Sequence, residues 1–330
     1  MKIISIFNNK GGVGKTTYMY HIAHILAQKG KTVLMVDLDS QCNLSAYALT
    51  DAELERSWKP ERGNSIWLAV EQVAKGVGDI RLRAPKPFNS NYPNLYITPG
   101  DVLLSTFEDN LGESWTRAIG GDERAIRVQS AVYRYLLWAA EKISADIVMV
   151  DLGPNLGALN RCVLGASDYF IVPMSPDLFS IRGTENLGKK LVNWRKEWRQ
   201  CINAWDGEEL AIPQGSPVFL GYVTQQHNVR STPSGMTNGW NIYGSQVESA
   251  VKSNIVSKLQ KIGQVHNWNT NTWKLGSIPN LHSLIPYSLN AKKPVFDCRS
   301  SDGLNGSHIT KARDSIGLFT PIVSKLMQVV

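Results

Sequence analysis

The residues best suited to chemistry form one short run, Lys10-Gly11-Gly12-Val13-Gly14-Lys15-Thr16-Thr17. Glycines at this spacing let backbone N–H groups turn inward around a polyphosphate, and a helix that starts there adds its positive dipole end. Lys15 would reach the β- and γ-phosphates, and the Thr16 hydroxyl would bind Mg²⁺. An ordinary glycine turn is the alternative. The context favours a nucleotide phosphate site formed by Gly11, Gly12, Val13, Gly14, Lys15, Thr16 and Thr17.

Three aspartates stand where strands are expected to end. Asp37 closes the strand expected at 31–37 and Asp39 follows it, and Asp151 follows four apolar residues at 147–150. A buried strand that ends in an aspartate can present its carboxylate to Mg²⁺ and the surrounding waters. Asp39 taken alone would also suit a cap for the next helix. An open α/β sheet places ligand chemistry at the carboxyl ends of its strands, which favours a functional role.

Apolar runs and helical spacing supply the elements that would position these groups. Strands are expected at 3–7, 31–37, 94–98, 145–151, 167–173 and 218–224, with helices between them such as that at 18–28. The pattern predicts the α/β class, with a mainly parallel, doubly wound sheet of about seven or eight strands flanked by helices. We expect one domain over residues 1–330. It would contain a variable helix and loop region at 44–125, an extended loop and helix at 225–275, and a closing segment with a terminal helix at 276–330.

Other stretches carry weaker patterns. Helices are expected at 65–77, 125–143 and 246–262, and loops at the proline-rich 79–93 and at the Gly-, Ser-, Asn- and Pro-rich 229–247. A long helix after Gly183 carries Trp194 and Trp198 at a spacing more typical of a core than of a base-stacking surface. The terminal helix at 316–330 contains Pro321 and lacks the dense Lys/Arg face of an interfacial membrane anchor.

Charge is unevenly placed along the chain. Residues 1–177 hold 18 Lys and Arg against 19 Asp and Glu, whereas residues 178–330 hold 17 against 9, so the whole excess of +7 lies in the second half. This asymmetry predicts a polyanionic partner, nucleic acid first and anionic lipid second; solvated charge without a partner is the alternative. The candidate DNA-binding residues are Lys189, Lys190, Arg195, Lys196, Arg199, Lys252, Lys258, Lys292 and Lys293.

Composition disfavours several other classes. The 43% hydrophobic and 19% charged residues are typical of a globular protein, and no apolar run approaches the ~20 residues of a membrane helix. The first residues enter the first expected strand without a secretory leader, and the cysteines show no C-x-x-C spacing. We therefore expect reduced thiols in a cytoplasmic protein. His21 and His24 have no further ligand nearby in sequence, which favours packing over a zinc site.

The lysine-glycine run resembles the deviant Walker A motif of the ParA/MinD family of ATPases. The resemblance implies that Lys10 reaches across a nucleotide-sandwiched dimer to the partner's phosphates, where a cation would stabilise transition-state charge as an arginine finger does. Asp37 to Asn43 resembles the family's switch I pattern D-x-D-P-Q-x-N, with Ser40 in place of proline. By that resemblance Asp39 positions the attacking water and Asp37 supports Mg²⁺. The catalytic residues implied are Lys10, Lys15 and Asp39.

The stretch at 146–157 is similar to the family's Walker B and switch II segments. Gly153 replaces the first proline of the D-x-P-P pattern, and Asp151 is the implied magnesium aspartate. The metal residues implied are therefore Thr16, Asp37 and Asp151.

Two later segments extend the resemblance. Residues 173–183 match a family register in which Asp177 replaces glutamate. The closing segment at 274–296 places Pro279 where relatives pack a loop on the adenine, and Gln225 to Asn228 are weaker adenine candidates.

The resemblance implies a P-loop ATPase that hydrolyses ATP slowly with Mg²⁺ and forms a homodimer when ATP binds. The leading interpretation is a partition ATPase that binds DNA nonspecifically, works with a stimulating ParB-like partner, and segregates or positions a plasmid, chromosome or other cargo. Such a protein would be cytoplasmic and nucleoid-associated. A MinD-like membrane-cycling ATPase is disfavoured by the terminal helix. A regulatory or metabolic P-loop module without DNA binding is the third interpretation, against which Lys10 argues.

Overall fold

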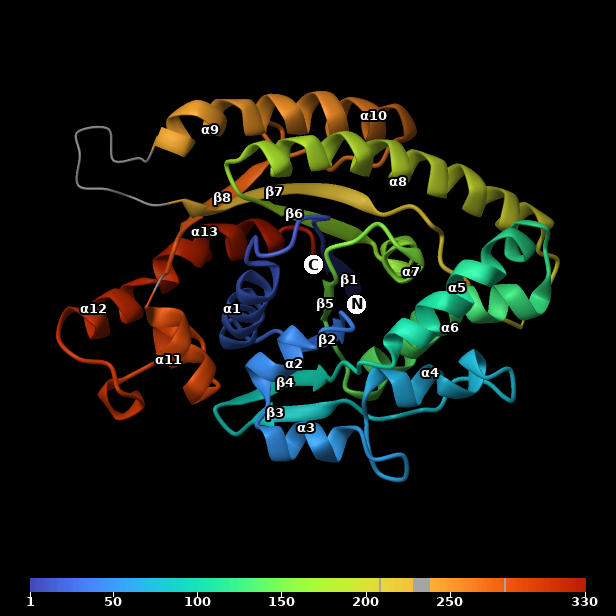
Figure 1. Cartoon of the computed structure of the whole chain (residues 1–330), viewed down its shortest axis with the longest axis horizontal. Helices are drawn as coiled ribbons and strands as arrows, with labels where there is room; N and C mark the ends of the chain where they lie inside the picture. The colour runs from blue at the N-terminus through green and yellow to red at the C-terminus, as the bar shows by residue number, and fades with distance from the viewer. Residues whose placement is uncertain (208, 228–237, 282) are drawn as a thin grey trace.

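The structure, a computed structural model, describes residues 1–207, 209–227, 238–281 and 283–330, and it is organised around one eight-stranded sheet (Figure 1). In chain order the strands are β1 (Lys2–Ile6), β2 (Val33–Leu38), β3 (Lys86–Asn89), β4 (Tyr92–Thr98), β5 (Ile147–Leu152), β6 (Tyr169–Met174), β7 (Val218–His227) and β8 (Lys274–Pro279). In space they follow the order β3-β4-β2-β5-β1-β6-β7-β8, and only the β3–β4 pair is antiparallel.

Helices connect and cover these strands. Those before β5 are α1 (Lys15–Gln28), α2 (Asn43–Ala48), α3 (Asp51–Ser57), α4 (Ile66–Ala74), α5 (Leu104–Ile119) and α6 (Glu123–Lys142). Those after it are α7 (Ala158–Ala166), α8 (Leu178–Ala204), α9 (Asn238–Val251), a π-helical turn (Lys252–Val256), α10 (Ser257–Leu259), α11 (Leu284–Ala291), α12 (Ser307–Asp314) and α13 (Ile316–Leu326). None of the helices in the described ranges is both long and apolar enough to cross a membrane.

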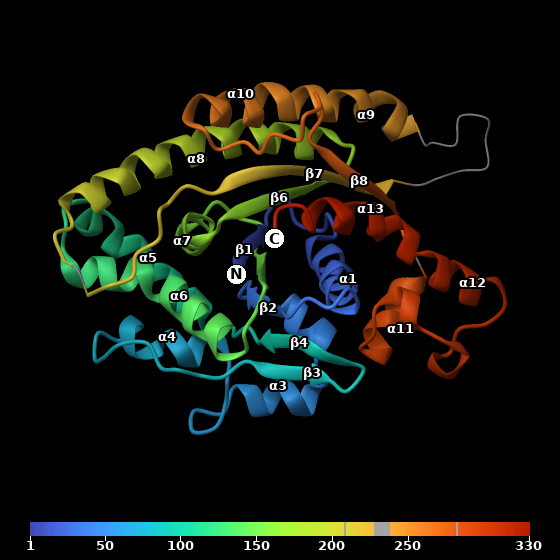
Figure 2. The ribbon, with the colours of Figure 1, turned by 180° about the vertical axis from the view of Figure 1, so that it is seen from behind.

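The central strands are buried on both faces, because alternate residues of a strand point to opposite sides of the sheet. In β2, Leu34, Val36 and Leu38 join one hydrophobic cluster, whereas Val33 and Met35 join the other. Helices α4 to α9 contribute to the first cluster, and α1, α2 and α13 contribute to the second. Figures 1 and 2 show the two layers of helices on either side of the sheet.

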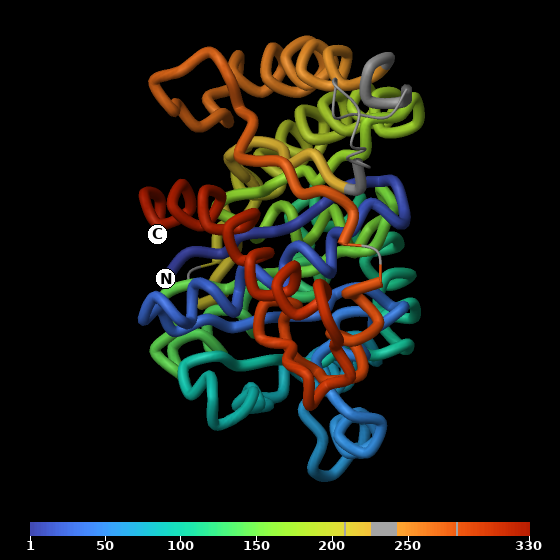
Figure 3. Tube along the Cα trace, turned by 90° about the vertical axis from the view of Figure 1, so that its left-hand side faces the viewer, coloured from blue at the N-terminus to red at the C-terminus, as the bar shows by residue number. Residues whose placement is uncertain are grey.

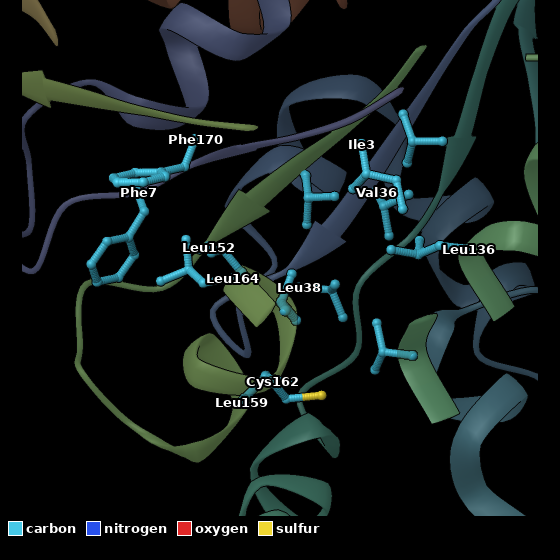
Figure 4. Close-up of a cluster of buried hydrophobic side chains, with 14 of the residues drawn as sticks. Ile3, Phe7, Val36, Leu38, Leu136, Leu152, Leu159, Cys162, Leu164 and Phe170 are labelled. Atoms are coloured by element: carbon cyan, nitrogen blue, oxygen red, sulfur yellow. The ribbon is translucent and has the colours of Figure 1, made fainter. Parts of the chain in front are cut away.

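The first cluster is the larger, and Figure 4 shows its centre. Ile3, Val36 and Leu152 reach it from three strands, and Leu159 and Leu164 reach it from α7. This packing joins α7, which directly follows the Asp151 strand, to the sheet.

The expected α/β class and mainly parallel sheet are confirmed, and two details of the 44–125 region differ from expectation. The proline-rich stretch at 79–93, expected to be a loop, contains the antiparallel edge strand β3. Pro87 is tolerated there because an edge strand does not need every backbone N–H for pairing. Helices α2 and α3 are too short to carry a clear period, whereas α5 has apolar Leu104, Phe107, Leu111 and Ala118 at helical spacing, a pattern that the sequence analysis missed.

The expected loop at 229–247 is wrong over its second part, because α9 begins at Asn238. Residues 228–237 lie outside the described ranges. Two glycines and several polar residues give this helix a weak local signal. Val247 and Val251 are nevertheless buried in the first cluster, so tertiary packing stabilises a helix that propensity disfavours.

The order of the strands brings the predicted site residues to one edge. β1, β5 and β2 are adjacent, and Asp37 of β2 is paired in register with Asp151 of β5. Both aspartates belong to the alternate positions that face α1, the helix that begins with Lys15. The sheet therefore places two carboxylates beside the start of α1.

Candidate functional site

The loop between β1 and α1 has the backbone conformation that its glycines permit. Gly12 and Gly14 have φ angles of +70° and +79°, in the left-handed region that residues with a Cβ disfavour. The Gly14 carbonyl accepts a bond from Tyr18 N at 2.9 Å, which starts α1. Helix and loop are therefore formed as a phosphate-binding N-terminus requires.

Lys15 lies inside this loop, and its side chain is almost fully buried. Its Nζ lies 3.4 Å from the Lys10 carbonyl, so the ammonium points back across the loop. Burial lowers the pKa of Lys15, and the carboxylates of Asp151 and Asp39 oppose that shift. Lys15 is therefore a buried cation whose charged form two carboxylates favour. Its ammonium can bind an anion that enters the loop.

Thr16 and Asp151 are joined directly, as the expected magnesium site requires. The Thr16 hydroxyl donates to Asp151 Oδ2 at 2.6 Å. Asp151 Oδ1 is buried and has no hydrogen-bond partner within the described parts of the chain. Burial and then the neighbouring Asp37 raise the pKa of Asp151 to about 8. An unpartnered carboxylate oxygen beside a hydroxyl is a donor set that suits a hard cation, so these residues fit Mg²⁺.

Asp37 lies beside Asp151, but its oxygens already accept bonds from the protein. Oδ2 accepts from Ser45 N at 2.8 Å and from Ser45 Oγ at 2.6 Å, and Oδ1 accepts from Asp39 N at 3.2 Å. Burial raises the pKa of Asp37 to about 6 despite these bonds. Asp37 thus holds the segment that carries Asp39, and its support of Mg²⁺ stays a prediction.

Asp39 is buried at the same edge, next to the turn that follows β5. Its Oδ1 accepts from Gln41 N at 3.0 Å. A Cβ at Gly153 would lie 3.2 Å from that oxygen, so glycine, which replaces the usual proline, leaves the carboxylate room. The structure brings Asp39 close to Lys15 and Asp151, where the predicted role would require it.

Lys10 is paired within its own chain. Its Nζ lies 2.5 Å from Asp177 Oδ2, and both side chains are about one third exposed. Asp177 also caps α8, because its Oδ1 accepts from Ser180 N at 3.0 Å. In the single chain the Lys10 ammonium is therefore engaged by a carboxylate.

The Gln225 side chain supports the loop between β1 and α1, a role that the sequence analysis did not predict. With its amide oriented to donate, Nε2 lies 2.7 Å from Val13 O and 3.0 Å from Gly14 O. Gln225 therefore holds the loop backbone, and these bonds engage the amide of a residue that the sequence offered as a weaker adenine candidate. The side chains of residues 226–228 lie outside the described part, and Pro279 ends β8 opposite His227 at the same sheet edge.

Asn160 on α7 is a second residue that the sequence did not single out. Its buried Nδ2 donates to Gly153 O at 2.9 Å, Asn155 O at 2.7 Å and Asn155 Oδ1 at 3.0 Å. These bonds fix the turn after β5 that carries Gly153. No local motif marks Asn160, because its partners lie five and seven residues away in a turn.

The basic candidates do not form one surface. Lys189, Lys190, Lys196 and Arg199 are exposed on α8, where Trp194 and Trp198 are buried as expected.

The remaining candidates are engaged or lie elsewhere. Arg195 is partly buried and donates to the Ile262 carbonyl, and Lys252 pairs with Glu248 at 3.0 Å. Lys258 Nζ lies 3.5 Å from the Glu185 carbonyl. Lys292 and Lys293 follow α11, beside α2 rather than α8, where they bond the Ala46 carbonyl and Asp302.

The histidines of α1 pack as the sequence predicted. His21 Nε2 accepts from Val295 N at 3.0 Å, and His24 Nδ1 lies 2.7 Å from Tyr20 O. The described residues contain no group of three or more side chains that could hold a metal ion through His, Cys, Asp or Glu. All four cysteines are free and buried.

Residues 1–204 match a family model described as an AAA domain. The chain is 28% identical over 187 residues to the sporulation initiation inhibitor protein Soj of Bacillus subtilis, covering 56% of this chain and 63% of Soj. It is 30% identical over 190 residues to the ParA family protein pGP5-D of Chlamydia psittaci, covering 57% and 62%. The chain belongs to the AAA domain family, and within it to the ParA-type P-loop ATPases.

The fold of this ParA-type ATPase extends the likeness beyond the matched sequence. The structure of a Cyanothece McdA variant in complex with ATP superposes with a TM-score of 0.65 at 14% identity, covering 99% of this chain and 96% of McdA. The match spans less than two thirds of the length of either curated relative named above.

Proposed function

We propose that this chain is a positioning ATPase that binds ATP with Mg²⁺, dimerises in the ATP state, and binds DNA nonspecifically to segregate or position a cargo. One observation carries the proposal: Thr16 and Asp151 are bonded to each other beside the buried Lys15, and Asp151 keeps one buried oxygen without a partner among the described residues. A structural aspartate would be expected to have both oxygens paired.

Each residue has a role in that proposal. The backbone from Gly11 to Thr17 would bind the phosphates together with Lys15, and Thr16 and Asp151 would hold Mg²⁺ with Asp37 behind them. When bound, Mg²⁺ would neutralise charge that develops on the phosphates. Asp39 would orient the attacking water, and Gly153 leaves it space to do so.

Lys10 links hydrolysis to dimerisation in this account. In one chain it is paired with Asp177, so it does not lie on its own phosphate site. A second subunit that brings a triphosphate to this edge would compete with Asp177 for the ammonium. Hydrolysis would then require the dimer, and loss of the γ-phosphate would release it.

The exposed cations of α8 are the proposed DNA contacts. Lys189 and Lys196 lie two helical turns apart, opposite the buried face of α8. Phosphate contacts release counterions, so affinity for DNA should fall steeply with salt. A stimulating ParB-like partner and a nucleoid location belong to the same proposal.

The two alternatives are less well supported. In α13, Phe319, Ile322, Val323 and Leu326 are buried against the fold, so its apolar face is not available as an amphipathic anchor. A module without DNA binding would leave the exposed cations of α8 without a role.

The test is binding of an arbitrary DNA duplex without nucleotide, with ADP and with ATP, at two salt concentrations. We expect binding with ATP that weakens at the higher salt, and stronger retention in Asp39→Ala, which should trap an ATP-bound dimer. Lys189→Ala/Lys196→Ala should weaken binding and flatten its salt dependence.

The matched control is Lys29→Ala/Lys142→Ala, which removes the same charge from two exposed sites at the ends of α1 and α6. It should bind DNA as the wild type does. Equal DNA binding in all three nucleotide states would contradict the proposal. An equal loss of DNA affinity in both double variants would also contradict it. A monomeric Asp39→Ala elution with ATP would contradict the dimer.

A further inference from the structure

A cleft lies apart from the candidate nucleotide site, between α3 and the segment that leads into β3. Its volume is about 440 Å³. Four of its lining side chains are cationic and come from three parts of the chain: Arg56 on α3, Arg62 in the next loop, and Arg83 and Lys86 at the approach to β3. We propose that this cleft binds a phosphate-bearing anion.

The charge balance of the cleft favours an anion. Glu53 is the one carboxylate among its lining residues, and it forms an ion pair with Lys86. Glu53 also accepts bonds from Thr50 N at 3.0 Å and Thr50 Oγ1 at 2.8 Å. Burial alone would raise the pKa of Glu53, but Lys86 and Thr50 outweigh it and lower that pKa to about 2. Three arginines are therefore left without a carboxylate in the cleft.

The arginine side chains have donors to offer. Arg56 uses Nε for the Ala52 carbonyl at 3.0 Å, and no hydrogen bond or ion pair within the described ranges engages its two terminal nitrogens. Arg62 has no hydrogen-bond or ion-pair partner among the residues that the structure describes. The guanidinium fork matches two oxygens of one phosphate group, which makes arginine the side chain of choice for such anions.

The walls of the cleft are fixed by bonds between its segments. The Arg83 guanidinium donates to Pro60 O at 2.7 Å and Glu61 O at 3.2 Å, and Asn64 Nδ2 donates to Ala84 O at 3.3 Å. These bonds tie the loop after α3 to the strand approach.

Close packing under the loop adds to this rigidity. A Cβ at Gly63 would lie only 2.2 Å from Ser57 O, so the loop is folded tightly onto the end of α3. Tyr135 OH donates to Arg83 O at 2.9 Å and anchors the other wall to α6. The cleft is thus a formed site rather than a chance gathering of mobile side chains.

The cleft is also separate from the proposed DNA contacts. α3 lies beside the β3 edge of the sheet, whereas α8 and α9 lie beyond the β7 and β8 edge. Figure 3 shows the two regions at opposite ends of the molecule, α3 in light blue and α9 in orange. The proposal therefore adds a second anion site to the chain and does not depend on its proposed function.

The experiment titrates pyrophosphate into the ADP-saturated protein at low salt, so that the phosphate loop is occupied. The cleft variant is Arg56→Ala/Arg62→Ala, in which both side chains are exposed and neither is needed for packing. The control is Lys59→Ala/Lys142→Ala, which removes two exposed charges that do not line the cleft. We expect one saturable site in the wild type and control, and about tenfold weaker binding in the cleft variant.

A second arm replaces pyrophosphate with a short DNA duplex in the same ADP-saturated proteins. If the cleft variant loses affinity for the duplex but not for pyrophosphate, the source of the phosphate is a nucleic-acid backbone. If it loses affinity for pyrophosphate, the source is a small ligand. The proposal is overturned if the cleft variant equals the wild type in both arms, or if the control loses as much affinity as the cleft variant.

Discussion

His21 and His24 are fully buried side chains of α1, and burial decides how they respond to acid. Burial lowers the pKa of His21 to about 4 and that of His24 to about 3, although backbone bonds to Thr17 and Tyr20 oppose the shifts. In the unfolded chain both would take up a proton near the ordinary value of 6.5. Between these values the unfolded state binds more protons, so the free energy of unfolding should fall as the pH decreases below about 6.5.

His24→Phe tests this at one residue. The new ring would sit among Tyr20, Phe88 and Tyr92, which surround His24 now. At pH 5 each buried histidine should lower the free energy of unfolding by about 2 kcal/mol relative to pH 7 or above, because one pKa unit corresponds to about 1.4 kcal/mol. The free energy of unfolding, measured in urea, should fall from pH 7 to pH 5 in both proteins. The fall should be smaller in the variant than in the wild type by about that amount. His308→Phe, at a partly exposed site on α12, is the control, and equal decreases in all three proteins would refute the assignment.

At the residue scale, what the sequence could predict depended on whether a residue belongs to a recognisable local motif. Thr16, Asp37 and Asp151 were predicted as neighbours because each follows a recognisable strand or loop, and the structure brings them together. The Lys10–Asp177 pair and the Gln225 support of the loop were not predicted. They depend on which strands lie side by side, and no local pattern carries that information.

At the scale of elements, the close approach of α8 to the π-helical turn depends on one glycine. A Cβ at Gly188 would lie 1.9 Å from Asn254 O and 3.2 Å from Lys258 Cδ. Gly188→Ala should separate the two helices and lower the free energy of unfolding by about 1–3 kcal/mol.

Gly112→Ala is the matched control for that change. Gly112 is an exposed helical glycine of α5 whose added Cβ would meet no described atom within 4 Å. This variant should be stabilised by up to about 1 kcal/mol, because alanine favours the helix more than glycine does. Urea unfolding of both variants measures the difference, and a Gly188→Ala protein as stable as the wild type would contradict the packing described.

The same scale explains which elements the sequence predicted. β2 and β5 each open with four apolar residues, and β1 carries three isoleucines around a buried serine, so all three suit burial on both faces. The first part of α9, at 238–245, was expected to be a loop because its glycines and polar residues favour one. Its buried valines stabilise it by packing in the first cluster, a tertiary contact that a local pattern does not record.

At the scale of the whole molecule, the three proposed binding sites lie at different parts of the sheet. The nucleotide site lies at the carboxyl ends of the central strands. The exposed cations of α8 lie towards the β8 edge, and the cleft of Arg56 and Arg62 lies at the β3 edge (Figure 1). The sequence predicted that an excess of positive charge would mark a partner surface. It could not predict that Lys292 and Lys293 lie away from α8, or that a basic cleft lies in the half without excess charge.

The central claim is that the loop from Gly11 to Thr17 binds a nucleotide through Lys15. The measurement that tests it most directly is the affinity for ATP with Mg²⁺ of the wild type and of Lys15→Ala, by calorimetry, with the fold of each checked by circular dichroism. Lys29→Ala, which removes an exposed charge at the far end of the same helix, is the control. We predict binding by the wild type and by the control, and none by a folded Lys15→Ala protein. Ordinary affinity in folded Lys15→Ala would contradict the account.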